Sequence, residues 1–108
     1  MIYEQRIYHA MPGRLPDLLA RFKDVTLPIW ERHEIRQAGF WTVLVGGSSH
    51  DLIYLLAWES MAEREQKWTA FSTDPEWLQR RGETERNGAL ISSFDNAFLQ
   101  PTSFSSVI

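Results

Sequence analysis

The order of the hydrophobic patterns constrains the fold of this chain more than any other feature of its sequence. Alternating or continuous apolar runs predict strands, and apolar residues at three- and four-residue steps predict helices. The strands are expected over residues 2–9, 40–45, 52–58 and 90–99, and the helices over residues 15–33 and 61–74. The order β-α-β-β-α-β predicts an α+β fold, in which a four-stranded antiparallel sheet carries its helices on one face. A chain of 108 residues makes one such domain, which we expect to span residues 1–108.

Capping and breaking residues predict where the helices begin and end. Pro28 interrupts the first helical stripe, so we expect either a kink or a new segment with Pro28 in its first turn. Gly39 is expected to end this helical region. Ser60–Glu63 has the capping-box pattern that starts a helix, and Asp74–Pro75 is typical of the start of a further short helix.

The central apolar runs predict a second copy of the chain on the free face of the sheet. Phe40 and Leu44 lie on one face of the expected strand, Trp41 and Val43 lie on the other, and residues 52–58 repeat this two-sided pattern. The two helices cover one face only, and an uncovered second face would be a larger apolar patch than soluble monomers usually tolerate. We therefore expect a homodimer with two-fold symmetry, in which the sheets pack face to face.

Composition argues against several classes of partner and site. The formal net charge is −3 and the pI is about 5.5, whereas a nucleic-acid partner requires a clustered basic surface. The chain has no cysteine, which excludes disulfides and thiolate chemistry and is compatible with a reducing compartment. The N-terminus lacks the apolar stretch of a secretory signal, and the longest apolar run, residues 52–58, is too short to cross a bilayer. We expect a soluble, cytoplasmic protein without a membrane partner.

The sequence also resembles the NIPSNAP family, which belongs to the dimeric α+β barrel group of ferredoxin-like folds. The matching segments are Tyr3–Tyr8, Pro12–Gly13, Pro28–His33, Gly39–Trp41, Arg64–Trp77 and Pro101–Ser105. The resemblance implies a homodimer with face-to-face sheets, but the biochemical activity of the family is poorly defined. Other dimeric α+β barrels include cofactor-free oxygenases, haem-degrading enzymes and dehydratases, and a shared fold alone does not transfer their functions.

Five residues are candidates for a ligand site in a cavity between helices and sheet. The imidazole of His33, on the apolar helical stripe, is either a core histidine with one hydrogen bond or a general base. Arg6 shares a strand face with Glu4 and either pairs with it or anchors an anion. Arg64 lies one helical turn before Trp68, where it either stacks on the indole or orients an anion. Trp41 and Trp68 are candidate walls for a flat aromatic ligand, or parts of an aromatic core.

Metal and cofactor motifs are incomplete. His33-Glu34 begins a zinc-protease pattern, but Gln37 stands where the second histidine is required. Gly46-Gly47 lacks the third glycine of a dinucleotide loop and is expected to lie in a hairpin. We therefore expect no metal and no cofactor.

Two functions remain open from the sequence. The first is a homodimer that binds a small aromatic or carbonyl-bearing molecule in its helix–sheet cavity, either for binding alone or as a cofactor-free enzyme with His33 as the base. The alternative is a non-enzymatic interaction module, in which the same residues are packing and function resides in exposed segments such as residues 46–51 or 100–108.

Overall fold

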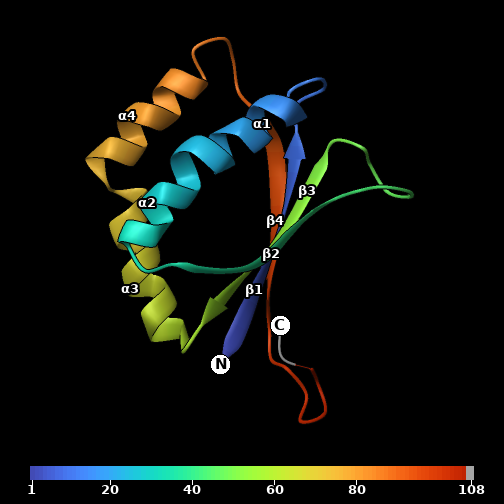
Figure 1. Ribbon diagram of the computed structural model, residues 1–108, viewed down its shortest axis with the longest axis vertical. Helices are drawn as coiled ribbons and strands as arrows, with labels where there is room; N and C mark the ends of the chain where they lie inside the picture. The colour runs from blue at the N-terminus through green and yellow to red at the C-terminus, as the bar shows by residue number, and fades with distance from the viewer. Residues whose placement is uncertain (107–108) are drawn as a thin grey trace.

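The computed structural model describes residues 1–106 and has the predicted β-α-β-β-α-β order (Figure 1). The strands are β1 Ile2–Ala10, β2 Arg36–Thr42, β3 Asp51–Trp58 and β4 Ile91–Leu99. They form one antiparallel sheet in the order β2-β3-β1-β4, so the ferredoxin-like α+β prediction is confirmed. The last two residues of the predicted 100–108 tail lie outside the described residues.

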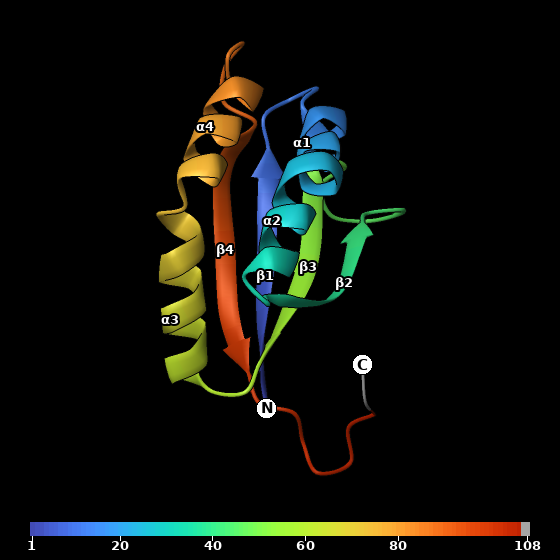
Figure 2. The same ribbon diagram turned by 60° about the vertical axis from the view of Figure 1, so that its left-hand side comes forward.

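The helices lie on one face of this sheet in two columns (Figure 2). One column contains α1 Leu15–Arg21, the π-helical turn η1 Phe22–Thr26 and α2 Leu27–Arg32; the other contains α3 Met61–Ser72 and α4 Pro75–Thr84. The first column lies over β1 and β3, and the second runs along β4. The molecule measures 45 × 37 × 19 Å, so its short dimension accommodates only this one layer of helices and one sheet.

The core lies between the helices and one face of the sheet. The pleat points alternate residues of β3 toward the helices, where the side chains of Leu52, Tyr54, Leu56 and Trp58 are fully buried. The Tyr54 ring stacks on Phe40 of β2, with their centroids 4.8 Å apart. Aromatic rings from α2, α3 and α4 continue this cluster across the helical layer.

The opposite face of the sheet carries apolar groups that no described helix covers. Ile7 of β1 pairs in register with Ile53 of β3, and Ile53 pairs with Trp41 of β2, whose side chain is 48% exposed. This open face, defined by these residues with Tyr3, Leu55 and Leu99, confirms the two-sided apolar pattern of β3. The strand expected over residues 40–45 is wrong at its end, because β2 stops at Thr42 and Val43 and Leu44 lie in the following loop. Part of the tail shares a shallow pocket with Tyr3, Leu55 and Leu99 at one end of this face, through Gln100, Pro101, Thr102 and Ser105.

The prediction that Gly39 ends the first helical region is wrong. Helix α2 ends at Arg32, and Glu34 takes the left-handed conformation, with φ 58°. The amide of Ile35 donates to Trp30 O at 2.9 Å and that of Glu34 donates to Glu31 O at 3.1 Å, which is the Schellman pattern with glutamate in the usual glycine position. Burial of both Ile35 and Trp30 supplies the hydrophobic contact that accompanies this motif.

Pro28 lies in the first turn of a new helical segment, which is one of the two outcomes expected from the sequence. A π-turn precedes this segment. Leu27 N–H donates to Phe22 O, a five-residue step, and α2 then begins with Pro28 in its first turn. Proline has no N–H for the usual four-residue step, so the helix widens before it without breaking. The wider turn changes which residues share a helix face.

The predicted starts of the second helical column are confirmed. Ser60 Oγ accepts from Glu63 N–H at 3.1 Å at the start of α3, and Asp74 Oδ1 accepts from two amide groups at the start of α4. Helix α4 is longer than the expected short helix and continues to Thr84.

The conformation of β2 requires glycine at position 39. We therefore predict that substitution of Gly39 by alanine, which adds one methyl group, clearly destabilises the protein. Its φ is 132°, and a Cβ there would lie 2.6 Å from the Trp41 ring. We expect Gly39→Ala to lower the free energy of unfolding by about 1–3 kcal/mol in chemical denaturation, through strain and the steric clash. The matched control is Gly82→Ala in α4, where the Cβ meets open space and helix propensity favours alanine by up to about 1 kcal/mol. Equal stability of Gly39→Ala and the wild type would contradict this role of Gly39.

Candidate functional site

A buried carboxylate links three strands and helix α3. Glu4 of β1 is fully buried and accepts five hydrogen bonds of 2.9–3.1 Å, with donors on β1, β3, β4 and α3. The donors are Arg6 Nη1, Trp58 Nε1, Arg64 Nε and Nη2, and Asn96 Nδ2. Two guanidinium groups around one carboxylate offset the cost of removing these charges from water.

Hydrogen-bond acceptors and aromatic rings of the protein surround the guanidinium group of Arg6. Its Nε donates to Tyr54 Oη at 2.8 Å and its Nη2 donates to Tyr8 Oη at 3.1 Å. The guanidinium carbon lies 4.7 Å from the Trp68 ring centroid and 4.9 Å from that of Phe94. Its charge therefore holds Glu4 and the two tyrosine hydroxyls in place, and the predicted pairing of Glu4 with Arg6 is confirmed.

The environment of Glu4 favours its ionised form. Burial alone raises the pKa of a carboxyl group, but the hydrogen bonds from Arg64, Asn96 and Arg6 outweigh it and hold the pKa of Glu4 below its usual value. Arg64 also stacks on Trp68 as the sequence suggested, with its guanidinium carbon 5.2 Å from the ring centroid.

A cleft opens between β4 and the α3–α4 column, next to this charge cluster. Its volume is about 380 Å³. Five of its twelve lining residues are aromatic and six more are charged residues or serines: Tyr8, Arg21, Trp68, Phe71, Ser72, Trp77, Arg81, Glu85, Ile91, Ser92, Ser93 and Phe94. The volume of this helix–sheet cleft lies within the range of about 300–1,000 Å³ that is typical of small-molecule pockets.

A smaller inner cavity adjoins the cleft on the side of η1 and α2. Its volume is about 30 Å³, and Tyr8, Arg21, Trp68, Phe71 and Trp77 line both spaces. The remaining walls of the inner cavity come from the first helical column, at Phe22, Thr26 and Trp30. The inner cavity therefore lies where the two helical columns and β1 meet.

Two polar groups in the wall of the inner cavity lack protein partners. Thr26 and Trp30 are 2% and 1% exposed, and within residues 1–106 neither Thr26 Oγ1 nor Trp30 Nε1 has a hydrogen-bond partner. Buried polar groups are satisfied in the great majority of cases, because an unmade hydrogen bond costs about 1–3 kcal/mol. Both residues line the inner cavity, which has room for a water-sized group.

Arg21 lies beside both spaces with weak partners. The residue is 5% exposed, its Nη1 donates to Thr84 Oγ1 at 3.4 Å, and Glu85 Oε2 lies 3.8 Å away. Its guanidinium carbon is 5.6 Å from the Trp77 ring centroid. Burial lowers the pKa of Arg21, which means that the protein provides less compensation for this charge than it provides for Arg6.

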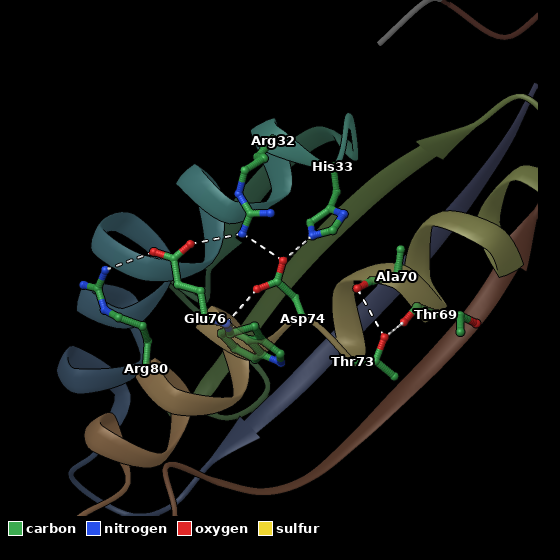
Figure 3. Close-up of polar contacts among 9 residues, drawn as sticks. Arg32, His33, Thr69, Ala70, Thr73, Asp74, Glu76 and Arg80 are labelled. Carbon is green, nitrogen blue, oxygen red and sulfur yellow. Dashed lines mark hydrogen bonds and ion pairs between the residues drawn. The ribbon is translucent and has the colours of Figure 1, made fainter.

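His33 lies outside the cleft, in an ion-pair network between α2 and the start of α4 (Figure 3). His33 Nε2 is 2.8 Å from Asp74 Oδ2, and Arg32 Nη2 is 2.8 Å from the same oxygen. Arg32 also pairs with Glu76, which reaches Arg80 one turn further along α4. The hydrogen bond from His33, with help from Arg32, holds the pKa of Asp74 well below its usual range. The network ties the two helical columns together.

A second histidine joins two strands on the open face. His9 Nδ1 is 2.7 Å from Asp51 Oδ1, and His9 Nε2 is 2.7 Å from Asp95 Oδ2. Asp95 and Asp51 raise the pKa of His9, because both ring nitrogens can donate only in the imidazolium form. No sequence pattern indicated this arrangement, which depends on strand register.

The five residues predicted for the site fall in three places. Arg6, Arg64 and Trp68 come together around Glu4, and of these Trp68 also lines the cleft. His33 lines neither the cleft nor the inner cavity, and Trp41 lies on the opposite face of the sheet. The role of His33 as a base stays a prediction.

Sequence reasoning missed Arg21, Thr26 and Trp30 as members of a site. The one signal that pointed toward them was Pro28, because the π-turn before it brings residues five positions apart onto one face. Within residues 1–106, no cluster of three or more His, Cys, Asp or Glu side chains is arranged to hold a metal ion. The described helices include none that is long and apolar enough to span a bilayer.

The fold and sequence define the class of this protein. The architecture is that of the dimeric α+β barrel superfamily of ferredoxin-like folds. Residues 3–106 match the sequence model of the NIPSNAP family, and the chain belongs to that family. No curated protein matches the chain.

Solved structures of other family members superpose closely. A NIPSNAP family protein of unknown function from Agrobacterium tumefaciens is 25% identical with a TM-score of 0.87, and the match covers 100% of this chain and 94% of that one. An uncharacterised NIPSNAP domain protein from Burkholderia xenovorans is 22% identical with a TM-score of 0.85, covering 99% of this chain and 100% of that one.

A more distant match shows the fold alone. A mutant of MhuD, solved with two manganese protoporphyrin IX molecules bound per active site, is 13% identical with a TM-score of 0.61. The match covers 99% of this chain and 100% of that one.

The Glu4 cluster predicts a pH-dependent contribution to stability. We expect Glu4→Gln to lower the free energy of unfolding at pH 7 by about 3 kcal/mol, because it leaves the buried Arg6 and the partly buried Arg64 without their counterion. The folded pKa is lowered, so the contribution of Glu4 is complete above its unfolded value of about 4.3 and is lost as pH falls through the folded value. Denaturation at several pH values should therefore show the gap between variant and wild type narrowing below about pH 4.

The control for this measurement is Glu59→Gln, which removes an exposed pair with Arg36. Its effect should stay below about 1 kcal/mol. A gap for Glu4→Gln that is constant from neutral to acid pH would show that Glu4 is not held ionised by its neighbours.

Proposed function

We propose that this protein is a homodimer that binds a small, flat, largely apolar molecule in the cleft between β4 and helices α3 and α4. The observation that carries the proposal is the continuity of an aromatic-walled cleft of about 380 Å³ with an inner cavity that contains unpartnered polar groups. Apolar walls supply affinity for a ligand, and a few placed polar groups orient it.

Aromatic walls favour a planar ligand. Trp68, Phe71 and Trp77 lie together along the cleft, with Trp68 and Phe71 centroids 5.2 Å apart and Phe71 and Trp77 centroids 4.8 Å apart. A planar conjugated ligand gains both burial and ring–ring contact there. The aromatic or carbonyl-bearing ligand expected from the sequence fits this lining.

A reaction in the cleft would use Tyr8. Its hydroxyl accepts from Arg6 and its side chain lines both the cleft and the inner cavity, so we assign it the donation of a phenolic proton to a bound carbonyl oxygen. His33 as a base remains the alternative from sequence, and its partner Asp74 is suited to orient it. Binding without a reaction, and a cytoplasmic location, stay open predictions.

The homodimer would form through the open face. Its centre is apolar at Ile7, Ile53 and Leu55, and Trp41 is 48% exposed at its edge. A second copy related by two-fold symmetry presents the same apolar surface and would cover it. The helices stay outside in this arrangement, so the cleft remains open to ligand.

Ligand binding is tested by a broad thermal-shift screen followed by a blocking variant. A ligand at a hundred times its dissociation constant should add about 2.7 kcal/mol to the free energy of unfolding. We expect hits to be planar and to lose at least tenfold in affinity for Ser72→Phe, which places a ring in the cleft. The matched control, Ala70→Phe, changes an exposed residue of the same helix that does not line the cleft. A silent screen together with a specific protein partner would favour the interaction-module alternative.

The dimer is tested by a charge on the open face. Sedimentation velocity at micromolar concentration should show a dimer for the wild type and a monomer for Ile53→Lys, because an unpaired buried charge costs at least about 3 kcal/mol, roughly a hundredfold in dissociation constant. Leu44→Lys is the control, since Leu44 is 97% exposed in the loop after β2. A folded wild-type monomer, or a dimer that survives Ile53→Lys, would refute the proposed interface.

A further inference from the structure

We propose that the inner end of the cleft is an anion subsite, formed by Arg21, Thr26 and Trp30, and that the ligand is therefore an aromatic carboxylate. This inference rests on the proposed ligand-binding function and adds the chemical class of the ligand.

The π-turn creates the subsite. Residues five positions apart face different directions on an α-helix, but the five-residue hydrogen bond of η1 brings Arg21 and Thr26 toward one side. Trp30 follows Thr26 by four residues in α2, which is one α-helical turn. Side chains from three successive segments of the first column therefore meet at the same cavity, as the lining shows. Interruptions of this kind occur often at functional sites.

The free groups in this subsite are donors and a cation. The Trp30 indole N–H can only donate, the Thr26 hydroxyl can donate, and both are buried without a protein partner within residues 1–106. Arg21 has five N–H groups, and its one hydrogen bond to the described protein is 3.4 Å long. A ligand with acceptor oxygens and a negative charge can pair with all three residues. A cation is repelled by Arg21, and a ligand that only donates can pair with the Thr26 hydroxyl alone.

The charges at the cleft favour a single negative charge. Arg21 and Arg81 line it on the positive side, and Glu85, which lies 3.8 Å from Arg21 and 3.3 Å from Arg81, is the one acidic residue of the lining. The cleft therefore carries a net charge of about +1 from its ionised lining side chains. A planar monocarboxylate places its ring between the aromatic walls and its two oxygens toward Arg21 and the inner donors.

Contrast with the Glu4 cluster supports the assignment. Arg6 and Arg64 share an internal carboxylate and have short hydrogen bonds, so they have little capacity for a ligand. Arg21 is as buried as Arg6 and has no comparable counterion. A buried guanidinium that the protein leaves weakly paired is the one suited to bind an exogenous carboxylate.

The test compares 2-naphthoate with its neutral counterpart 2-naphthamide by isothermal titration calorimetry on the full chain. We expect wild-type protein to bind 2-naphthoate at least tenfold more tightly than 2-naphthamide. Arg21→Met should abolish this preference while leaving 2-naphthamide affinity within about threefold. Removal of the weakly paired buried charge should also leave the protein folded.

Thr26→Val supplies a second readout that does not depend on charge. Valine has nearly the same shape as threonine and removes the unpartnered hydroxyl, so the melting temperature of the free protein should rise while 2-naphthoate affinity falls. If the inner cavity is a site for a buried water only, Thr26→Val should instead lower the melting temperature and leave 2-naphthoate affinity unchanged, and this outcome overturns the subsite.

The outcomes separate this inference from the proposed function. Equal affinity for 2-naphthoate and 2-naphthamide, with both weakened by Ser72→Phe, overturns the anion subsite and retains the cleft as a ligand site. A preference for 2-naphthoate that survives Arg21→Met also overturns it. If neither probe binds and the broad screen is silent as well, both the subsite and the ligand-binding function are wrong.

Discussion

The buried Glu4 carboxylate is the interaction on which the arrangement of this protein depends. It receives donors from three strands and from α3, so the docking of the second helical column onto the sheet is fixed by hydrogen bonds as well as by apolar contact. A buried carboxylate with too few hydrogen bonds would strongly destabilise the protein. The five hydrogen bonds to Glu4 instead fix the positions of the elements that donate them. The cleft lies directly beside this connection, and Trp68, which Arg6 and Arg64 both contact, is one of its walls. The rigid cluster therefore supports the wall of the candidate site.

Two buried arginine environments in one small domain have different roles. Arg6 is enclosed by partners on β1 and β3, and its aromatic neighbours complete its surroundings. Arg21 is buried beside the inner cavity and has only distant partners. The first environment stabilises the fold, and the second leaves a charge and two donors available next to an apolar cleft. Because Arg21 is weakly paired and Arg6 is fully paired, we assign binding of the ligand's charged group to the Arg21 end of the cleft.

The features that depend on local periodicity could be predicted from the sequence. The positions of the strands along the chain, the two-sided apolar pattern of β3 and the pairing of Glu4 with Arg6 follow from the two-residue repeat of a strand. The cap at Asp74 was predictable because the first amide groups of a helix have no partner within the helix, and an aspartate side chain can accept their hydrogen bonds. The helix end was misjudged because Glu34 occupies the left-handed position that glycine usually takes, and tertiary burial of Ile35 compensates for its strain.

The candidate site was less accessible to sequence reasoning for a physical reason. An uninterrupted α-helix places residues five apart on different faces, so Arg21 and Thr26 were not expected to be neighbours, and only the π-turn brings them to one cavity. His33 was a reasonable candidate by residue type, but its position relative to the cleft depends on where α2 ends. Strand register likewise determined the contact of His9 with two aspartates, which lie on separate strands.

The most direct test of the central claim is the indole N–H resonance of Trp30 in a proton–nitrogen NMR spectrum during titration with 2-naphthoate. Trp30 lies in the inner cavity and Trp41 lies on the opposite face of the sheet, so the two report on different surfaces of the same molecule. We predict a saturable downfield shift of the Trp30 indole proton, as it gains a charged acceptor, and no change for Trp41. An unchanged Trp30 resonance at saturating 2-naphthoate would contradict the anion subsite.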